Sequence, residues 1–272
     1  MQSSSSAANL FSVRFDFSSR EPLPAEEFLR LRKEEVRHRN ARLEHPFVRL
    51  LFDGRLTLEQ LRGWALQDYA LKRCPTWWNA GRLLNSPTLA VQRRVVRSLL
   101  EELGDEGHGH TDMYQRFLAG LGVAADEMEH APLLPSTVLA LDAFMAINSR
   151  RDVVESLASG SVAGEAINVE FSTGVVDAND RAYHLPKAAL EWFYEHIEAD
   201  KGHSSLGERL VLEFAVTKDI QNRVWDAVIR SKSIYWVFFD GVYQAYVLGN
   251  GTSHPHYKPG LDLPHHYPFS FL

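Results

Sequence analysis

The sequence predicts an all-α protein, and three observations support this fold class. Apolar residues recur three and four positions apart over long stretches, which is the spacing of one face of an α-helix. Few stretches alternate apolar and polar residues with the period of two that a half-buried strand shows. Short segments containing proline or glycine separate the helical stretches, so we expect a single bundle of about seven helices.

The N-terminal half divides into helices at its proline, glycine and cap residues. Pro24 suits the first turn of a helix, Gly54 ends a short element, and Thr57 is a candidate N-cap. Pro75 falls inside the next stretch and is expected to kink it, and a helix that opens at a Ser-Pro pair stops near Gly104. The elements expected in this half span residues 24–40, 45–54, 56–84, 86–105 and 110–123.

The C-terminal half continues the pattern. Many small side chains in its second element let neighbouring helices approach closely or leave room for a ligand. Pro186 suits the first position of the element that follows. The elements expected in this half span residues 135–150, 152–176, 186–216 and 217–249.

The two ends of the chain differ from this helical region. Residues 1–22 open with a serine-rich segment, where we expect a disordered leader. Residues 249–272 are rich in proline, histidine and aromatic residues, so we expect an irregular tail that lies on the domain or on a partner subunit. Residues 23–248 then form one helical domain.

Composition limits the classes of function. The chain has 272 residues, 45% of them hydrophobic, and a formal net charge of −6, which is ordinary for a globular protein. The acidic balance argues against nucleic-acid binding, which needs a basic surface. No apolar run reaches the roughly 18 residues of a membrane span, and the N-terminus lacks the features of a secretory signal. We therefore expect a cytoplasmic protein without nucleic-acid or membrane partners.

Cys74 is the one cysteine of the chain, so an internal disulfide is impossible. It precedes Pro75 and a pair of tryptophans in an apolar stretch. A free cysteine in such a setting is more often a buried structural thiol than a nucleophile, and we expect the structural role.

The stretch EHIEADKGHSS places two imidazoles and a carboxylate on one stripe of an expected helix. His196, Asp200 and His203 stand at positions i, i+4 and i+7, which share one helix face. The same row extends to Trp192 before them and Leu210 after them, so the stripe should face the core. Because histidine is a common metal ligand, we interpret the stripe as half of a metal site, with a satisfied polar seam as the alternative.

A second group lies at the end of one expected helix and the start of the next. Glu102 continues a buried apolar row, and His110 is in register with the apolar face of its own helix. Glu101 is one step round the helix toward arginines, and His108 stands in a glycine-flanked loop. We therefore favour Glu102 and His110 as ligands, with Glu101 and His108 as runners-up.

Glu165 is the third candidate and lies in the stretch of small residues. It is bracketed by apolar side chains, and a buried carboxylate is costly unless its charge is compensated. A metal ion would supply that compensation. Glu155 and Glu170 compete for the same role, which leaves the choice open at this point.

Together the candidates supply three carboxylates and three imidazoles from four expected helices. Helical bundles build metal sites from such side chains, which project inward from facing helices. Carboxylate and imidazole ligands without thiolate suit iron or manganese, and two Fe(II) ions that share a carboxylate could together pass electrons to dioxygen. The six positions are Glu102, His110, Glu165, His196, Asp200 and His203.

The pattern LLEELGD…GHTDMYQRFLAGLGV, followed by an isolated glutamate and then HIEADKGH, resembles the haem-oxygenase-like diiron oxidases and oxygenases. The wider superfamily includes the thiaminase TenA, pyrroloquinoline-quinone synthase and the chlamydial death-domain-associating protein. The likeness covers roughly residues 25–248, and the six metal ligands of the family fall on the six positions named above. It implies a haem-oxygenase-like helical bundle, two iron ions, O2 as co-substrate and frequently a homodimer.

The resemblance also implies a reaction class. A diiron oxygenase or oxidase would N-oxygenate, desaturate or cleave a small amino-acid-like or carboxylate metabolite in a biosynthetic pathway, drawing on an external electron donor where needed. The alternative is a metal-free member of the fold, which would be a cofactorless oxidase of the pyrroloquinoline-quinone synthase type or a thiaminase-like hydrolase. Such a protein would use His196 and His203 as acid and base. A third interpretation is a non-enzymatic interaction protein whose polar stripe is structural.

The substrate side of the site is the least specified. In this superfamily the helix that carries Tyr69 and Lys72 commonly lines the pocket, so the resemblance implies that these two residues contact the substrate. A basic residue such as Lys72 or Arg73 could bind a substrate carboxylate. The alternative is that Lys72 and Arg73 are both surface charges.

Overall fold

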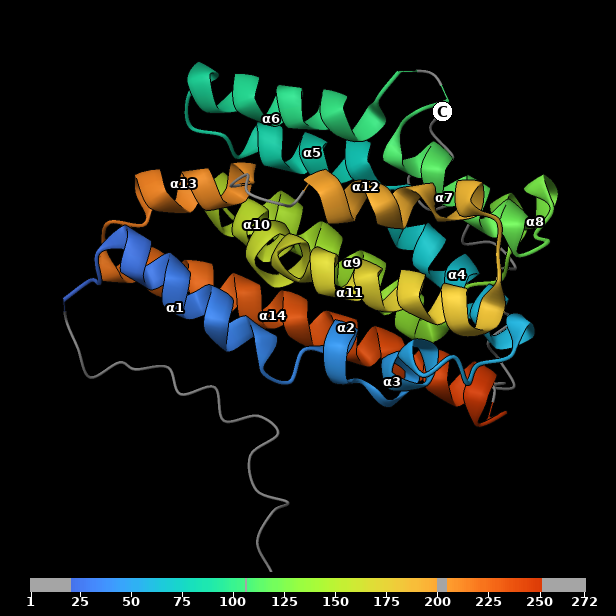
Figure 1. The fold of residues 1–272 in the computed structure, drawn as a ribbon. Helices are drawn as coiled ribbons and strands as arrows, with labels where there is room; N and C mark the ends of the chain where they lie inside the picture. The colour runs from blue at the N-terminus through green and yellow to red at the C-terminus, as the bar shows by residue number, and fades with distance from the viewer. Residues whose placement is uncertain (1–20, 106, 200–204, 251–272) are drawn as a thin grey trace, which may run out of the picture.

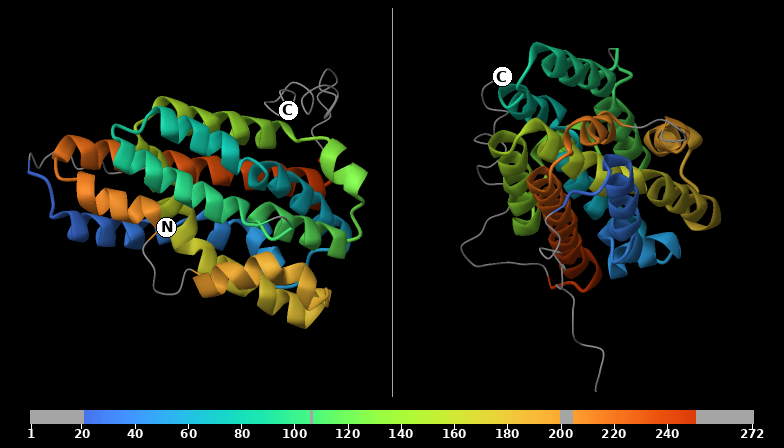
Figure 2. Two further views of the ribbon diagram at one scale, coloured as in Figure 1. Left: turned by 90° about the horizontal axis from the view of Figure 1, so that it is seen from above. Right: turned by 90° about the vertical axis from the view of Figure 1, so that its left-hand side faces the viewer.

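The computed structural model describes residues 21–105, 107–199 and 205–250, and within these ranges it contains helices and no strand (Figure 1). This confirms the all-α class. The long helix α14 (Lys218–Val242) runs along almost the full length of the bundle. The other long helices lie roughly along the same axis, as the two turned views in Figure 2 also show. Most of the predicted leader and most of the predicted tail fall outside the described residues.

The helices follow one another with short connections. The first eight are α1 (Ala25–Arg37), α2 (Ala41–Glu44), α3 (Pro46–Phe52), α4 (Leu58–Lys72), α5 (Pro75–Leu84), α6 (Leu89–Leu103), α7 (His110–Gly120) and α8 (Ala125–His130). They are followed by α9 (Pro135–Arg150), α10 (Val153–Gly160), η1 (Ser161–Glu165), α11 (Ala166–Ala178), η2 (Asn179–Tyr183), η3 (Lys187–Leu190), α12 (Glu191–Ala199), α13 (Leu206–Phe214), α14 and η4 (Tyr243–Val247).

The prediction of about seven helices is wrong, because several expected elements are interrupted. Pro75 does not kink a continuous helix; it is the first residue of α5, where its missing amide hydrogen is not needed. The helix expected over residues 186–216 is also divided. The described part of α12 ends at Ala199, and Ser205 starts α13 by accepting a hydrogen bond from the Glu208 amide.

Cap residues fix several of the predicted boundaries. Thr57 caps α4 in a capping box with Gln60, as predicted. Gly104 ends α6 in a backbone conformation with φ of 60°, which glycine adopts without strain. The start of α6 was expected at the Ser-Pro pair that begins with Ser86, but Thr88 is the N-cap and accepts a hydrogen bond from the Val91 amide.

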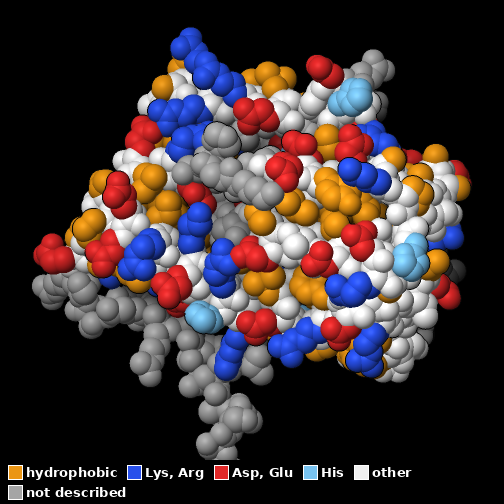
Figure 3. Space-filling view, viewed as in Figure 1, with side chains coloured by type: hydrophobic (Ala, Val, Ile, Leu, Met, Phe, Trp, Pro, Cys, Tyr) orange, Lys and Arg blue, Asp and Glu red, His pale blue; other side chains and the backbone are white. Residues whose placement is uncertain are grey.

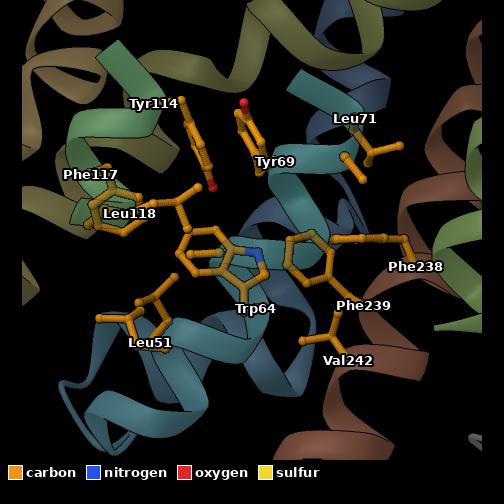
Figure 4. Close-up of a cluster of buried hydrophobic side chains, with 14 of the residues drawn as sticks. Leu51, Trp64, Tyr69, Leu71, Tyr114, Phe117, Leu118, Phe238, Phe239 and Val242 are labelled. Atoms are coloured by element: carbon orange, nitrogen blue, oxygen red, sulfur yellow. The ribbon is translucent and has the colours of Figure 1, made fainter. Parts of the chain in front are cut away.

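The interior contains two clusters of buried apolar side chains. The larger surrounds Trp64 and Phe117, and Figure 4 shows these two residues packed with side chains from α3, α4, α7 and α14. The smaller surrounds Ile167 and Leu210 and joins α1, α10, α11, α13 and α14. These clusters hold the helices that carry the candidate site in fixed relative positions.

A π-helical turn interrupts the central helix. The α10 helix passes directly into the π-helix η1, which ends at Glu165, and the chain continues as α11. Gly207 of α13 packs so closely here that an added Cβ would lie 2.0 Å from the Ser161 Oγ. A π-turn inserts an extra residue into a helix and is frequent at functional sites, so its position beside Glu165 directs attention to this carboxylate.

The surface carries charges of both signs. Figure 3 shows acidic and basic side chains interspersed over one face of the molecule. In the part of the chain that the structure describes, no helix combines the length and apolarity needed to cross a lipid bilayer.

Candidate active site

Three helices bring Glu102, His110 and His196 together. Glu102 lies in the last turn of α6, His110 is the first residue of α7, and His196 lies on α12. The Glu102 Oε2 is 2.8 Å from the His110 Nδ1, and the centroids of the His110 and His196 rings are 4.9 Å apart. The neighbouring pair Glu102 and His110 is joined by the distant His196 to form one cluster of a carboxylate and two imidazoles.

Trp192 fixes the orientation of His196. The spacing of four residues places Trp192 one turn before His196, and their ring centroids are 3.8 Å apart. The His196 Nδ1 is 2.7 Å from the Trp192 carbonyl oxygen, which can only accept a hydrogen bond, so this ring nitrogen donates. The Nε2 of neutral His196 is then the nitrogen with a free lone pair, which is the form that binds a metal ion.

The cluster sets the protonation states of its members. Burial, together with the neighbouring positive charge of His110, lowers the pKa of His196 to about 3, so His196 is neutral at physiological pH. Burial also lowers the pKa of His110, but the hydrogen bond and negative charge of Glu102 outweigh this effect and raise it overall. Burial raises the pKa of Glu102, yet the hydrogen bond from His110 prevails and the net pKa is lowered.

Lys72 extends the cluster on the side of α4. Its Nζ lies 4.3 Å from the centroid of the Trp192 ring, and burial lowers its pKa although the charge of Asp68 opposes the shift. Lys72 is half-buried against Trp192, and its contact with a substrate stays a prediction. Arg73 points elsewhere and forms an ion pair with Glu129 at 3.2 Å.

Tyr69 lies one layer behind this cluster. Its hydroxyl accepts a hydrogen bond from the Gln115 Nε2 at 2.7 Å, and its ring stacks on that of Tyr114 with centroids 6.4 Å apart. Figure 4 shows the two tyrosine rings side by side. Tyr114 in turn packs edge-on against Trp192 at 5.6 Å, so Tyr69 reaches the cluster through a second aromatic ring.

Glu165 ends the π-helix η1, and its charge acts on Arg82 of α5. Burial lowers the pKa of Arg82, while the charges of Glu165 and Glu102 both act to raise it, so both carboxylates lie near this guanidinium. Arg82 is further held by a hydrogen bond from its Nε to the Asn148 Oδ1 at 2.8 Å. Arg82 was not identified from the sequence. In the structure it lies on α5 within electrostatic reach of Glu102 and Glu165.

The two competitors of Glu165 are engaged elsewhere. Glu155 is paired with Arg151 at 3.0 Å and also with Arg223. Glu170 is paired with Arg37 on α1. Among the three glutamates, Glu165 is the one whose charge acts on Arg82 beside Glu102.

The remaining predicted ligands are not all placed. Asp200 and His203 lie outside the described residues. Glu101 and His108 are exposed. Across residues 21–105, 107–199 and 205–250, no three His, Cys, Asp or Glu side chains come close enough to one another to hold a metal ion.

Two further residues of this region were not identified from the sequence. The Tyr114 hydroxyl donates a hydrogen bond to the Asp68 Oδ2 at 2.8 Å, and both side chains are buried. Burial raises the pKa of Tyr114 well above its usual value, and the charge of Asp68 adds to this effect. A signal existed, because Asp68 stands four residues before Lys72 on one face of a largely apolar helix.

Cys74 is a buried thiol, as predicted. Its side chain is 4% exposed, and its Sγ lies 3.2 Å from the Ala70 carbonyl oxygen, to which the thiol donates. Burial raises the pKa of Cys74 to about 12. A nucleophilic cysteine requires the opposite shift, so this thiol is unsuited to catalysis.

We expect Cys74 to resist thiol reagents in the folded protein. At pH 8 a free cysteine of pKa near 8.5 is about one quarter thiolate, whereas a thiol of pKa about 12 is thiolate in roughly one molecule in ten thousand. Titration with a chromogenic disulfide should therefore give a rate at least about 100-fold below that of free cysteine. In guanidinium chloride one thiol per chain should react at the ordinary rate, and fast reaction without denaturant would contradict the assignment.

The fold and the site define a helical-bundle protein with a half-buried carboxylate–imidazole cluster. Residues 62–236 match a family described as iron-containing redox enzyme, and the chain belongs to that family. The haem-oxygenase-like fold is also found in solved structures. A TenA homologue from Pseudomonas syringae covers 82% of this chain with a TM-score of 0.66 and 17% identity. A domain of unknown function with a haem-oxygenase-like fold from Shewanella denitrificans covers 86% with a TM-score of 0.67 and 16% identity.

Characterised relatives share about a quarter of their residues with this chain. The bifunctional coenzyme PQQ synthesis protein C/D of Methylorubrum extorquens is 26% identical over 80% of this chain, which spans 59% of that relative's length. The pyrroloquinoline-quinone synthase of Pseudomonas aeruginosa is 25% identical over 87% of this chain and 94% of its own length. The 4-aminobenzoate synthase of Nitrosomonas europaea is 28% identical over 75% of this chain and 86% of its own length.

Proposed function

We propose that this protein is an O2-dependent oxidoreductase that uses iron to oxidise a small amino-acid-like or carboxylate metabolite. The observation that carries the proposal is the convergence of Glu102, His110 and His196 from three helices, with His196 held neutral and its Nε2 free of the Trp192 carbonyl. The description of the family as iron-containing redox enzymes supports it.

The donor types in this cluster suit iron, although no three of the donors lie close enough together in the described part of the chain to hold the ion. A carboxylate and two imidazoles without a thiolate form a ligand set that Fe(II) accepts. The hydrogen bond from the His196 Nδ1 to a backbone carbonyl is the outer contact that ordinarily orients a metal-binding histidine. Glu102, His110, Glu165 and His196 would hold the iron, together with Asp200 and His203, which the resemblance places in the same set. When bound, iron would supply the electrons that reduce dioxygen.

Residues around the cluster would transfer protons and exclude water while the substrate reacts. Lys72 lies against Trp192, and its lowered pKa makes it suited to hold or release a proton beside the cluster. The aromatic faces of Trp192 and Tyr114 exclude water from one side of the site. Arg82 lies near both Glu102 and Glu165, and its charge helps to lower the pKa of Glu102.

A second candidate is an oxidase that works without a metal. The names of two of the relatives, a pyrroloquinoline-quinone synthase and a PQQ synthesis protein, match this candidate more directly than they match a diiron enzyme. The hydrogen-bonded pair of Glu102 and His110 would then act as a proton-transferring pair in place of a metal-binding one. A thiaminase-like hydrolase has less support, because Cys74 is buried and its pKa is raised.

Metal removal separates the two candidates. The full chain would be treated with a chelator, dialysed, loaded with Fe(II) under argon and then mixed with air-saturated buffer. If iron is the cofactor, we expect about two irons per chain, O2 uptake and a transient visible absorption band, all lost after chelation and restored by Fe(II). A protein that retains negligible iron after loading would contradict the diiron proposal. O2 consumption that is indifferent to chelation would select the metal-free candidate.

A further inference from the structure

Arg42 is a buried cation that the chemistry described above does not use. It lies on α2 and is 5% exposed. Its Nη1 donates to the Asn168 Oδ1 at 2.6 Å and to the Gly164 carbonyl oxygen at 3.3 Å, and both of these acceptors are neutral. Within the described part of the chain, its Nε and Nη2 have no hydrogen-bond acceptor, and no carboxylate pairs with it.

Arg42 belongs to the same region as the candidate site. The Gly164 carbonyl that it binds immediately precedes Glu165 in the π-helix η1. Its charge acts on Lys72, Tyr114 and Tyr235, so all three lie within electrostatic reach of the guanidinium. Arg42 is therefore close enough to influence side chains of α4, α7 and α14, among them Lys72, which lies against Trp192.

Aromatic rings hold the guanidinium plane in place. The Arg42 Cζ lies 4.6 Å from the centroid of the Phe171 ring and 5.8 Å from that of Tyr235. Because the Nη1 is the nitrogen engaged in hydrogen bonds, the edge that carries Nε and Nη2 remains for a ligand. This edge is the one that binds a carboxylate with two parallel hydrogen bonds.

The charges of Asp68 and Glu165 act on Tyr235 as that of Arg42 does, but neither carboxylate forms an ion pair with Arg42 among the described residues. A buried cation without a partner is costly, because it has lost its hydration. Arg82, the other arginine of the site, has Glu102 and Glu165 near it. Asp68 accepts the Tyr114 hydroxyl and forms no ion pair with Arg42. A bound carboxylate would supply the charge that Arg42 lacks.

We propose that Arg42 is the carboxylate-binding residue of the substrate site, so that the substrate is a small carboxylic acid bound through the Nε–Nη2 edge. This assignment rests on the proposed function only in that the cluster acts on a bound substrate. Arg42 determines which molecules bind and how they are oriented, while Glu102, His110 and His196 lie at the position of the reaction.

Calorimetric titration of the full chain under argon tests the assignment. Benzoate and hexanoate are the probes, each beside its uncharged amide, and the titrations are made with and without added Fe(II). Wild type should bind at least one acid about tenfold or more tightly than its amide, and Arg42→Met should lose this preference, because charged hydrogen bonds of this kind contribute that much. Arg32→Met is the matched control, since Arg32 also stacks on aromatic rings, 4.7 Å from Trp225 and 5.5 Å from Phe28, but lies on α1.

The outcomes separate this proposal from the proposed function. Wild type that binds neither acid better than its amide would overturn the role of Arg42, whatever the iron content or O2 uptake. Acid binding that survives in Arg42→Met would do the same. Normal acid binding in a protein that takes up neither iron nor O2 would leave Arg42 assigned and contradict the diiron proposal. If Arg42→Met does not fold, Arg42→Lys tests the proposal in its place. Weaker acid binding by Arg42→Lys is expected, and unchanged acid binding would contradict the role of Arg42.

Discussion

Replacement of His196 by alanine is expected to abolish iron binding at the candidate site and the O2 uptake that depends on it. His196 presents a neutral imidazole whose Nδ1 donates to the Trp192 carbonyl, which leaves its Nε2 available, and its ring centroid lies 4.9 Å from that of His110. Loss of a residue that merely supports a metal ligand weakens metal binding about 10- to 100-fold, so loss of a ligand should cost at least about 100-fold. Iron per chain after Fe(II) loading, and the rate of O2 consumption on mixing with air, measure the effect.

A surface histidine supplies the control for this experiment. His130 on α8 is exposed and pairs with Asp126, so His130→Ala should leave both iron content and O2 uptake unchanged. His196→Gln adds a second comparison, because it retains a polar side chain but not the imidazole. Iron binding and O2 uptake equal to wild type in His196→Ala would remove His196 from the ligand set. A fall in turnover without any change in iron would instead favour an acid–base role for this residue.

Replacement of Trp64 by alanine should cause a large loss of stability, because this side chain lies at the centre of the larger apolar cluster. Trp64 is 1% exposed, and the centroid of its ring lies 6.0 Å from that of Phe47 and 6.1 Å from that of Phe117. Truncation would leave a cavity where three helices meet and should lower the free energy of unfolding by about 3–5 kcal/mol. Chemical denaturation followed by circular dichroism measures the change.

Two substitutions calibrate that measurement. Trp64→Phe keeps an aromatic ring and removes an indole N–H that has no acceptor among the described residues, so its cost should be clearly smaller. Val237 is 50% exposed on α14, and Val237→Ala should change the stability by less than about 0.5 kcal/mol. If Trp64→Ala lost no more stability than Val237→Ala, the cluster around Trp64 would not be the principal core.

Local chemistry made some features of the structure predictable. Thr57 and Gly104 were recognisable from the sequence because a cap side chain and a left-handed glycine satisfy backbone groups within a few residues. Burial of Cys74 followed from its apolar neighbours. The number of helices was not predictable in the same way, because a helical pattern of apolar residues can continue across a break such as the one at Pro75.

The candidate site was predictable only in part. The i, i+4 spacing placed Trp192 against His196, and registers within single helices singled out Glu102 and His110. The sequence analysis missed Arg42, Arg82 and the Asp68–Tyr114 pair. Each of these side chains forms its hydrogen bond with a residue on another helix. No periodicity within one helix reports such a partner.

The sequence by itself determined the all-α class, the resemblance to haem-oxygenase-like oxidases and the acidic and imidazole side chains available to the site. These properties depend on residue types and on spacings of a few residues, which a helix converts directly into faces. Only the tertiary structure decided that His110 meets both Glu102 and His196, that Lys72 lies against Trp192, and that Arg42 is buried without an anion. Those relations depend on how separate helices pack, because burial and the approach of charges from different helices are set by the whole bundle.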